Sequence, residues 1–422
     1  MMNDQQRRER AFSSRHQVPG QLGYRQLNYP QPHRRRRRHV IGTRLLVTAS
    51  LLLVLALLFA ARDTAARLVS HQAQQLTSSM QATPHPYAAL IASQVDRLLT
   101  NKLTHRQFSG SVLIAHNGQL LLNKGYGMAD WDHQVPNTPR TRFYLGSSTK
   151  QFTAMAILIL QQRGKLHLVD QLCAYITHCP PAWQPVTIHE LLTHTSGIPQ
   201  LDHSPVSYPS PQAWITSYNR IPLAFTPGHL FNYCNVCYQI LGYVVEQASG
   251  EPYSVFLKQA IFDPLQMKDT GFDSEYYSLP DHADGYASWR VKAESIEGSS
   301  APQWSFLFGS GLLYTTVEDL YRWDQALYTR ALVSQQLLDE AFTPYIASQY
   351  AGSGYGYGWF IANGPLPGHR LIWHDGRVDG FRTYIGRYPD DRVTIIFLSN
   401  LSTVDELALA SVLGQIVFTN TR

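Results

Sequence analysis

The sequence predicts an α+β fold. An antiparallel sheet flanked by helices is built from both ends of one domain, with a mostly helical lobe inserted between them and one transmembrane helix in front. Strand-like runs occur near residues 110–126 and again near 369–400, and the residues between them are mainly helical and loop-rich. An uncharged apolar run lies near residue 50. The 422 residues, 44% of them hydrophobic, suffice for a large core.

Residues 1–39 form a predicted basic cytoplasmic tail. Residues 1–44 contain eleven Arg against Asp4 and Glu9, whereas the rest of the chain carries 24 basic and 28 acidic residues. The body is therefore mildly acidic, which argues against nucleic acid as a partner of the globular part. We interpret the tail as a topology signal rather than a nucleic-acid site.

Residues 40–61 are predicted to form a transmembrane helix. Leu45–Ala61 carries no charge, and with residues 40–43 the run approaches the roughly 20 residues that cross a bilayer. The Arg run at 34–38 precedes it, which places the N-terminus in the cytoplasm and the body outside the cell membrane. A cleaved signal peptide is the alternative, but its basic region would be far too long, so we predict an uncleaved anchor. Residues 62–84, rich in Ala, Gln, Ser and Thr, are the predicted linker to a folded domain at 85–422.

The folded domain begins with a predicted helix and hairpin. Tyr87–Leu103 has apolar residues at helical spacing. Gly110–His116 and Gln119–Tyr126 read as strands, and the Asn117-Gly118 pair between them is a strong hairpin signal. We expect a helix laid on antiparallel strands.

The remaining elements complete the sheet around a helical lobe. Helices are predicted at Ile188–Thr193, Val236–Ser249 and Tyr253–Ile261, strands at His369–His374, Gly380–Tyr388 and Val393–Asn400, and a last helix at Asp405–Phe418. One sheet built from both ends and interrupted by a helical insertion leaves a cleft between its lobes, where sites tend to lie.

A polar Ser147-x-x-Lys150 sits at the start of an apolar helix that Gly164 ends. Ser147 lies in the first turn, where unpaired backbone N–H groups favour negative charge, and Lys150 is one turn further along the same face. A helix-capping serine with a solvated lysine is the default for an exposed helix. Because this helix is apolar all round, a buried lysine would be costly without a function, so we predict that Ser147 is a nucleophile and Lys150 its base.

Tyr233-x-Asn235 places a phenol and an amide on a loop before the next helix. A phenol near an ammonium group loses its proton more easily and can relay protons to a leaving group. Taken alone, the pair is more often an aromatic anchor and a helix cap. The Tyr233-x-Asn235 pair is therefore evidence for an active site only together with the other clusters.

The third cluster is His374-Asp375-Gly376-Arg377, at the predicted end of a strand. A cation here would hold a substrate carboxylate or a developing oxyanion. The alternative is a solvated hairpin turn, since Asp375-Gly376 is a good turn pair.

The four cysteines form two close pairs. Cys173 and Cys179 bracket a short loop in which we predict a disulfide, worth about 2 kcal/mol by loop entropy. Cys234-x-x-Cys237 has the spacing of a redox pair or half a zinc site, but no second pair or compact His cluster accompanies it, so we interpret both as small residues in the core or at a helix start.

No metal or other cofactor is predicted. His189 and His194 suggest a metal site or a catalytic triad, but no third ligand has matching spacing, so we interpret both as structural.

The clusters, in this order, resemble the serine hydrolases of the class C β-lactamase and D-alanyl-D-alanine carboxypeptidase superfamily, over about residues 87–420. Besides Ser147-Ser-Thr-Lys150 and Tyr233-Cys-Asn235, the supporting stretches are Val186–Gly197, Phe225–Gly228, Gly309–Gly311, Thr315-Thr316, Asp319-Leu320 and Gly380-Phe381.

The resemblance implies a β-lactamase/transpeptidase-like fold and a role for each site residue. Ser147 would be the acylated nucleophile, Lys150 and Tyr233 the base and proton relay, and Asn235 a ligand of the substrate amide. The backbone N–H groups of Ser147 and Arg377 would form the oxyanion hole.

One motif departs from the β-lactamases. His374-Asp375-Gly376 replaces Lys-Thr-Gly: the His resembles peptidase-like relatives, while the Asp argues against recognition of a penicillin carboxylate unless Arg377 or Arg382 substitutes. We therefore expect a membrane-anchored extracytoplasmic serine hydrolase that cleaves amides or esters of a small-molecule or peptide substrate. The alternatives are a small-ester esterase of the same fold and a non-catalytic relative that binds peptidoglycan-like peptides or acts as a scaffold. The sequence does not determine an oligomeric state.

Overall fold

The computed structural model describes residues 87–201, 209–272, 276, 278–293, 309–311, 313–363, 366 and 368–421. The predicted tail, transmembrane helix and linker lie outside these residues. Within the described ranges, none of the helices combines the length and the apolar character that crossing a bilayer requires. The described residues belong to one compact unit.

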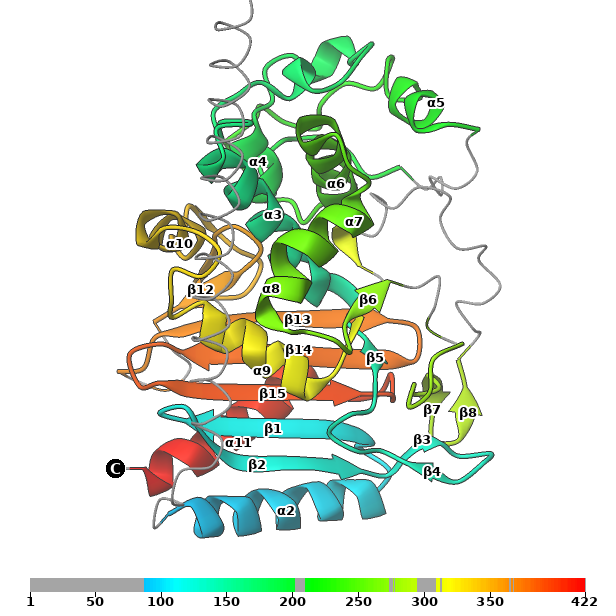
Figure 1. Cartoon of the computed structure of the whole chain (residues 1–422), viewed down its shortest axis with the longest axis vertical. Helices are drawn as coiled ribbons and strands as arrows, with labels where there is room; N and C mark the ends of the chain where they lie inside the picture. The colour runs from blue at the N-terminus through cyan, green and yellow to red at the C-terminus, as the bar shows by residue number, and fades with distance from the viewer. Residues whose placement is uncertain are drawn as a thin grey trace, which may run out of the picture. The chain divides into compact units, whose positions relative to one another are not determined.

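The core of the domain is an eight-stranded antiparallel sheet with the order β10-β11-β12-β13-β14-β15-β1-β2 (Figure 1). Its strands are β1 (Gly110–His116), β2 (Gln119–Tyr126), β10 (Ile346–Ala347), β11 (Ser353–Tyr355), β12 (Phe360–Ala362), β13 (Leu371–Val378), β14 (Phe381–Tyr388) and β15 (Val393–Ser399). The first strand pairs with the last over its whole length, from Gly110↔Ser399 to His116↔Val393. This confirms a sheet assembled from both ends of the domain.

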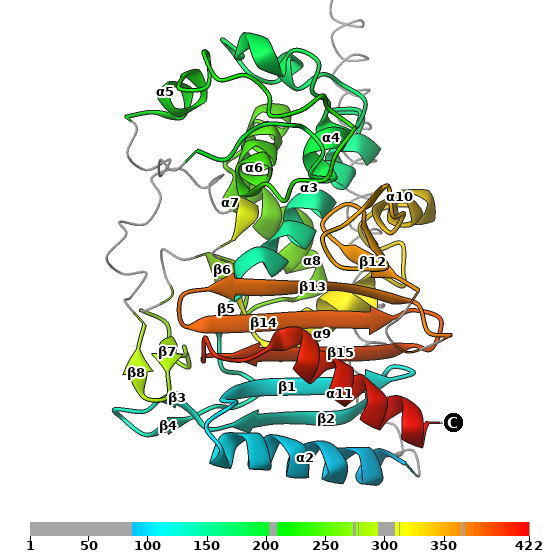
Figure 2. The same cartoon turned by 180° about the vertical axis from the view of Figure 1, so that it is seen from behind.

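Two helices cover one face of the sheet, α2 (Ala88–Thr104) and α11 (Glu406–Asn420) (Figure 2). Their apolar residues, such as Ile91, Val95 and Leu413, pack with one side of the central strands. The termini of the domain therefore meet on this face. The predicted helix at each end and the β1–β2 hairpin, with Asn117 and Gly118 both at positive φ, are confirmed.

The inserted lobe packs on the other face through α9 (Val317–Ala326), and helices α4 to α7 lie beyond β13 (Figure 1). Its elements are α3 (Lys150–Gln162), α4 (Ile188–Leu192), α5 (Pro211–Thr216), α6 (Asn235–Ser249), α7 (Tyr253–Leu257), the π-helix Lys258–Phe262, α8 (Asp263–Leu265), α9 (Val317–Ala326) and α10 (Gln335–Ala341). Short strands and turns connect them: β3 (Met128–Asp130), β4 (Val135–Pro136), β5 (Phe143–Tyr144), β6 (Gly271–Phe272), β7 (Tyr286–Ser288), β8 (Val291–Lys292), β9 (Leu313–Thr315), and the 3-10 helices Gly146–Thr149, Leu172–Ala174 and Pro181–Trp183. The first eleven residues of α3 are all buried, as its apolar sequence predicts.

The α+β class is confirmed, with two corrections at the ends of elements. The third predicted helix stops at Leu257 and continues as a π-helix, and β13 does not end at His374 but runs to Val378. The hairpin turn that joins β13 to β14 therefore lies at Asp379-Gly380, with Gly380 at φ +83°, and not at Asp375-Gly376. The third cluster is consequently part of a strand.

Candidate active site

Ser147 lies where the inserted lobe meets β13. It belongs to the 3-10 helix Gly146–Thr149, which leads directly into α3, and it is partly exposed while its neighbours are buried. Gly164 ends the helical segment at φ +66°, as predicted. Ser147 is thus presented at the start of a rigid, buried element.

Lys150 is fully buried, and three oxygen atoms surround its amine. Its Nζ lies 3.1 Å from Ser147 Oγ, 2.8 Å from Asn235 Oδ1 and 2.8 Å from the carbonyl oxygen of Ser310. Burial lowers the pKa of Lys150 well below its ordinary value, and the negative charge of Asp375 opposes this only in part. The environment therefore favours the neutral amine.

Tyr233 and Asn235 flank this amine from the start of α6. Lys150 Nζ lies 4.8 Å from the centre of the Tyr233 ring. The Tyr233 hydroxyl is buried and, within the described residues, has no hydrogen bond of ordinary geometry. Burial raises the pKa of Tyr233 well above its usual value, and the Ser147 hydroxyl opposes that effect. The structure thus brings Ser147, Lys150, Tyr233 and Asn235 together.

His374 is buried at the edge of the same site. Its Nδ1 donates to the Asp375 carbonyl oxygen at 2.6 Å, so its Nε2 accepts from the Tyr355 hydroxyl at 3.2 Å. Burial, assisted by the positive charge of Lys150, lowers the pKa of His374 to about 3. The residue that replaces the Lys of Lys-Thr-Gly is therefore neutral at physiological pH, with its ring centre 6.3 Å from that of Tyr233.

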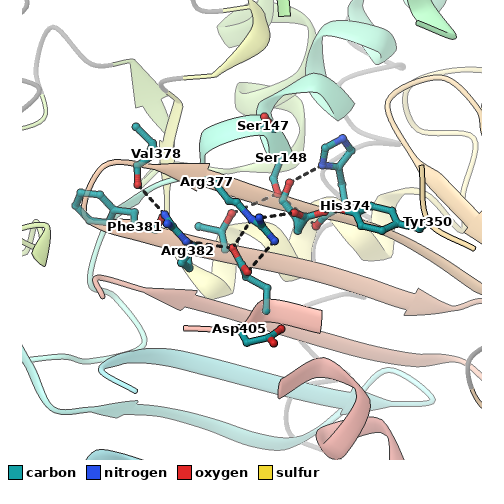
Figure 3. A network of polar contacts seen from close by, with 12 residues as sticks. Ser147, Ser148, Tyr350, His374, Arg377, Val378, Phe381, Arg382 and Asp405 are labelled. Atoms are coloured by element: carbon teal, nitrogen blue, oxygen red, sulfur yellow. Dashed lines mark hydrogen bonds and ion pairs between the residues drawn. The ribbon is translucent and has the colours of Figure 1, made fainter. Parts of the chain in front are cut away.

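The Arg377 guanidinium and the Asp375 carboxylate form contacts away from Ser147. Arg377 Nε and Nη2 lie 3.1 and 3.3 Å from the two carboxylate oxygens of Glu406, the first residue of α11 (Figure 3). Arg382 Nε lies 3.5 Å from the same carboxylate. Asp375 contacts Arg377 Nε at 3.6 Å and the Tyr350 hydroxyl at 3.4 Å. Both arginines are thus paired with the buried Glu406, which sequence reasoning did not predict.

Close backbone packing brings the Arg377 backbone beside the serine segment. A Cβ on Gly146, which has φ +56°, would lie 2.7 Å from the Arg377 nitrogen, and a Cβ on Gly376 would lie 1.9 Å from the Leu145 carbonyl oxygen. Thr383 Oγ1 also donates to that carbonyl at 2.7 Å. β12 pairs with β13 only at Leu371–Trp373. The edge of β13 beyond Trp373 is therefore not covered by β12, and the serine segment Gly146–Thr149 packs there. Two glycines thus allow the two backbones to approach each other.

Both cysteine pairs are disulfides. The Cys173–Cys179 bond is as predicted. Cys234 caps the start of α6 and Cys237 is buried, as predicted, but the two are bonded to each other, which corrects their interpretation as two separate small residues. The C-x-x-C spacing fits a bonded pair, a metal site or two separate residues, so the sequence alone does not decide between them.

Ser310 and the two histidines complete the surroundings. Ser310 contacts Lys150 through its backbone carbonyl, so no side-chain pattern identifies it, although it lies in the Gly309–Gly311 stretch that supports the family resemblance. His189 Nδ1 pairs with the Tyr357 hydroxyl at 2.8 Å, and His194 Nδ1 accepts from the Cys234 N–H at 3.0 Å. The two histidines thus have separate partners.

The fold and the Ser147–Lys150–Tyr233 cluster together define a protein with a serine hydrolase-type fold. The Beta-lactamase family profile matches residues 95–415, and this chain belongs to that family.

Individual relatives are consistent with this family. The chain is 34% identical over 303 residues to the putative penicillin-binding protein PbpX of Bacillus subtilis, which covers 72% of this chain and 73% of PbpX. Among solved structures, an octameric penicillin-binding protein homologue from Pyrococcus abyssi is 30% identical with a TM-score of 0.68, covering 78% of this chain and 77% of that one. A penicillin-binding protein from Bacillus halodurans is 25% identical with a TM-score of 0.65, covering 75% and 98%.

Proposed function

We propose that the protein is a serine hydrolase that cleaves amide or ester bonds through an acyl-enzyme on Ser147. The observation that carries this proposal is the set of partners around Lys150. Asn235 Oδ1 and the Ser310 carbonyl can only accept, so they use both N–H bonds of a neutral amine. The lone pair then faces Ser147 Oγ at 3.1 Å, where it accepts the hydroxyl proton.

The proposed reaction follows from this arrangement. Ser147 Oγ attacks the substrate carbonyl as its proton passes to Lys150. The oxyanion is held by the backbone N–H groups of Ser147 and Arg377, which the close approach of Gly146 to the Arg377 nitrogen brings together. Tyr233 passes a proton to the leaving group, and water then hydrolyses the acyl-enzyme by the reverse sequence. Asn235 positions Lys150 and binds the substrate amide, and His374 lines the site as a neutral group.

The proposed substrates are D-alanyl peptides or related small molecules. A small-ester esterase is the second candidate, and Asp375 favours it. This carboxylate is 7% exposed and follows the neutral His374, so the strand that replaces Lys-Thr-Gly brings a negative charge and no lysine to an incoming carboxylate. Arg377 and Arg382 do not offset this freely, because both pair with Glu406. A neutral ester is not repelled by the Asp375 carboxylate.

We further propose that residues 40–61 anchor the enzyme in the cell membrane with its N-terminus in the cytoplasm, and that residues 62–84 hold the domain outside. The charge distribution of the sequence supports this topology.

A non-catalytic binding or scaffold role is disfavoured by the intact nucleophile, base and phenol.

The test uses the full chain in detergent micelles. We expect a fluorescent penicillin or a short-chain p-nitrophenyl ester to give a mass adduct or turnover, and Ser147→Ala to abolish both. Ser148→Ala is the matched control, since Ser148 Oγ faces the His374 carbonyl and Thr383 instead of Lys150. A folded protein without adduct or turnover on either substrate refutes the enzymatic proposal, and activity that survives in Ser147→Ala means a different nucleophile.

A further inference from the structure

His194 packs behind Tyr233 and has no part in the reaction proposed above. It is 1% exposed and lies in the turn after α4. Its ring centre lies 4.4 Å from that of Tyr233, with the two planes 35° apart. The rings of Tyr355 and Tyr238 lie 4.7 and 5.0 Å away. The imidazole therefore forms part of the aromatic wall against which the phenol rests.

Two hydrogen bonds that His194 accepts hold the backbone on either side of Tyr233. The Cys234 N–H donates to His194 Nδ1 at 3.0 Å, and the Asn232 N–H donates to the His194 carbonyl oxygen at 2.9 Å. The residues before and after Tyr233 are thus tied to one residue, which also packs against the Tyr233 ring. This combination fixes both the position of the Tyr233 backbone and the plane of its side chain.

The imidazole has to be neutral for this role. Nδ1 accepts a hydrogen bond, so the single ring proton is on Nε2, which is buried and has no hydrogen-bond partner in the described part of the chain. Burial and the nearby Lys150 and His374 lower the pKa of His194 well below its ordinary value. A neutral imidazole supplies an aromatic face and an acceptor nitrogen without placing a positive charge beside Lys150.

The same turn also contacts the far end of the disulfide next to Tyr233. Ser196 Oγ lies 3.1 Å from Cys237 Sγ, and Cys237 is bonded to Cys234. His194 itself has φ +59°, a left-handed conformation that Asn tolerates better than most residues. The turn at 194–196 is thus built against the segment that carries Tyr233.

We propose that His194 is a positioning residue for Tyr233, holding the phenol hydroxyl where it delivers a proton to the leaving group. This inference rests on the proposed function. Proton delivery matters most for poor leaving groups such as alkoxides and amines, and hardly at all for p-nitrophenolate, which departs as an anion. A displaced Tyr233 should therefore slow the hydrolysis of an ethyl ester far more than that of a p-nitrophenyl ester with the same acyl group.

The test compares three variants on these two esters, in the full chain. His194→Phe keeps a ring but lacks the acceptor, His194→Asn places Oδ1 near the position of Nδ1 and suits the left-handed backbone, and His189→Asn is the control, since His189 bonds to Tyr357. We expect His194→Phe to lower kcat/KM, which reports the formation of the acyl-enzyme, by about 30-fold for the ethyl ester and by less than about threefold for the p-nitrophenyl ester. His194→Asn should recover about half of this loss on a logarithmic scale. His189→Asn should behave as the wild type.

The results separate the two proposals. Equal losses on both esters, or a wild-type rate in His194→Phe, overturn the positioning role while leaving the serine mechanism intact. A wild type that turns over neither ester refutes the proposed function, and the positioning role falls with it. If His194→Phe does not fold by circular dichroism, His194→Gln replaces it, because its amide oxygen lies one bond too far out to accept from the Cys234 N–H. A His194→Gln variant that matches His194→Asn on the ethyl ester then contradicts the proposal.

Discussion

Among the residues that the structure describes, one lysine and one arginine are buried, and the groups that they contact differ in charge. Lys150 is 0% exposed and Arg387 is 1% exposed. Arg387 contacts a carboxylate, because its Nε lies 3.1 Å from Asp324 Oδ1. Lys150 contacts two carbonyl oxygens and a hydroxyl, all of them neutral.

The pair formed by Arg387 and Asp324 is structural. It links β14 to α9 across the face of the sheet, and the rings of Tyr328 and Phe342 lie 4.2 and 5.1 Å from the guanidinium carbon. Burial raises the pKa of Asp324, while Arg387 opposes that effect. Neither facing atom has hydrogen-bond geometry, so the attraction is between charges. Each charge makes the burial of the other tolerable.

Lys150 has no carboxylate in contact with its amine. Asp375 is near enough to raise its pKa, but burial is the larger effect and lowers it. The comparison shows two environments for a buried basic group in one fold. With a carboxylate in contact, the charge of Arg387 is kept. Without one, burial favours the neutral amine of Lys150, which is the form that the mechanism we propose requires of a base.

The largest expected effect comes from removing the uncompensated amine. Lys150→Met should lower kcat/KM on a p-nitrophenyl ester by about 1,000-fold, because no group then removes the Ser147 proton. Thermal unfolding should occur within a few degrees of the wild type, since no buried counter-charge is stranded. Lys165→Met, at an exposed lysine, is the control. Activity above about a tenth of wild type would show that Lys150 is not the base.

The opposite result is expected for the compensated cation. Arg387→Met leaves Asp324 buried without its partner and should lower the free energy of unfolding by about 3–5 kcal/mol, measured by urea denaturation. The activity per folded molecule should be unchanged, because Arg387 lies near the end of β14, beside Ile372 and Thr394, and not at Ser147. Arg140→Met, at an exposed position, should change stability by less than about 0.5 kcal/mol. A comparably small effect of Arg387→Met would mean that the pair contributes little to stability.

The sequence predicted Lys150 but not Arg387, and the reason is distance along the chain. Lys150 and Ser147 are one helical turn apart, so their contact follows from local geometry. Arg387 and Asp324 come from a strand and a helix that only the tertiary fold brings together. The same holds for Glu406 and Arg377. Local periodicity cannot reveal such pairs.

Strand bounds were predicted well where apolar runs and turn signals agree. β1, β2 and β15 were predicted within one residue because each contains a run of apolar residues, and the Asn117-Gly118 turn pair separates β1 from β2. The end of β13 was wrong because His374, Asp375 and Gly376 are polar or small, and Asp-Gly is a common turn pair. Here that polarity serves the site: the strand continues, and its polar residues line the serine segment.

An intermediate effect is expected when the catalytic amine is given a carboxylate like the one beside Arg387. Asn235→Asp places an anion about where Oδ1 now lies, 2.8 Å from Lys150 Nζ. An opposite charge in contact should raise the pKa of Lys150 by about 1–3 units. The acidic limb of the kcat/KM profile should then move to higher pH by the same amount, lowering activity near neutral pH by at most about 1,000-fold. Asn235→Ser removes the amide without adding charge and serves as the control for lost contacts. If Asn235→Asp leaves that limb in place while lowering the plateau, Lys150 is not the group that titrates.

The smallest effect should come from removing the distant charge. Asp375 is not in contact with Lys150, yet its negative charge raises the pKa of that amine against the effect of burial. Asp375→Asn takes this contribution away, so the pKa of Lys150 falls and more of it is neutral at any acidic pH. The acidic limb of kcat/KM should therefore shift to lower pH, by less than about one unit, which is opposite in sign to the shift in Asn235→Asp. His374 does not obscure this limb, because its pKa of about 3 lies below the working range. Asp379→Asn, in the exposed turn four residues on, should leave the profile unchanged. A shift to higher pH in Asp375→Asn would mean that the carboxylate acts on another group, such as the Tyr233 phenol, whose pKa it also raises.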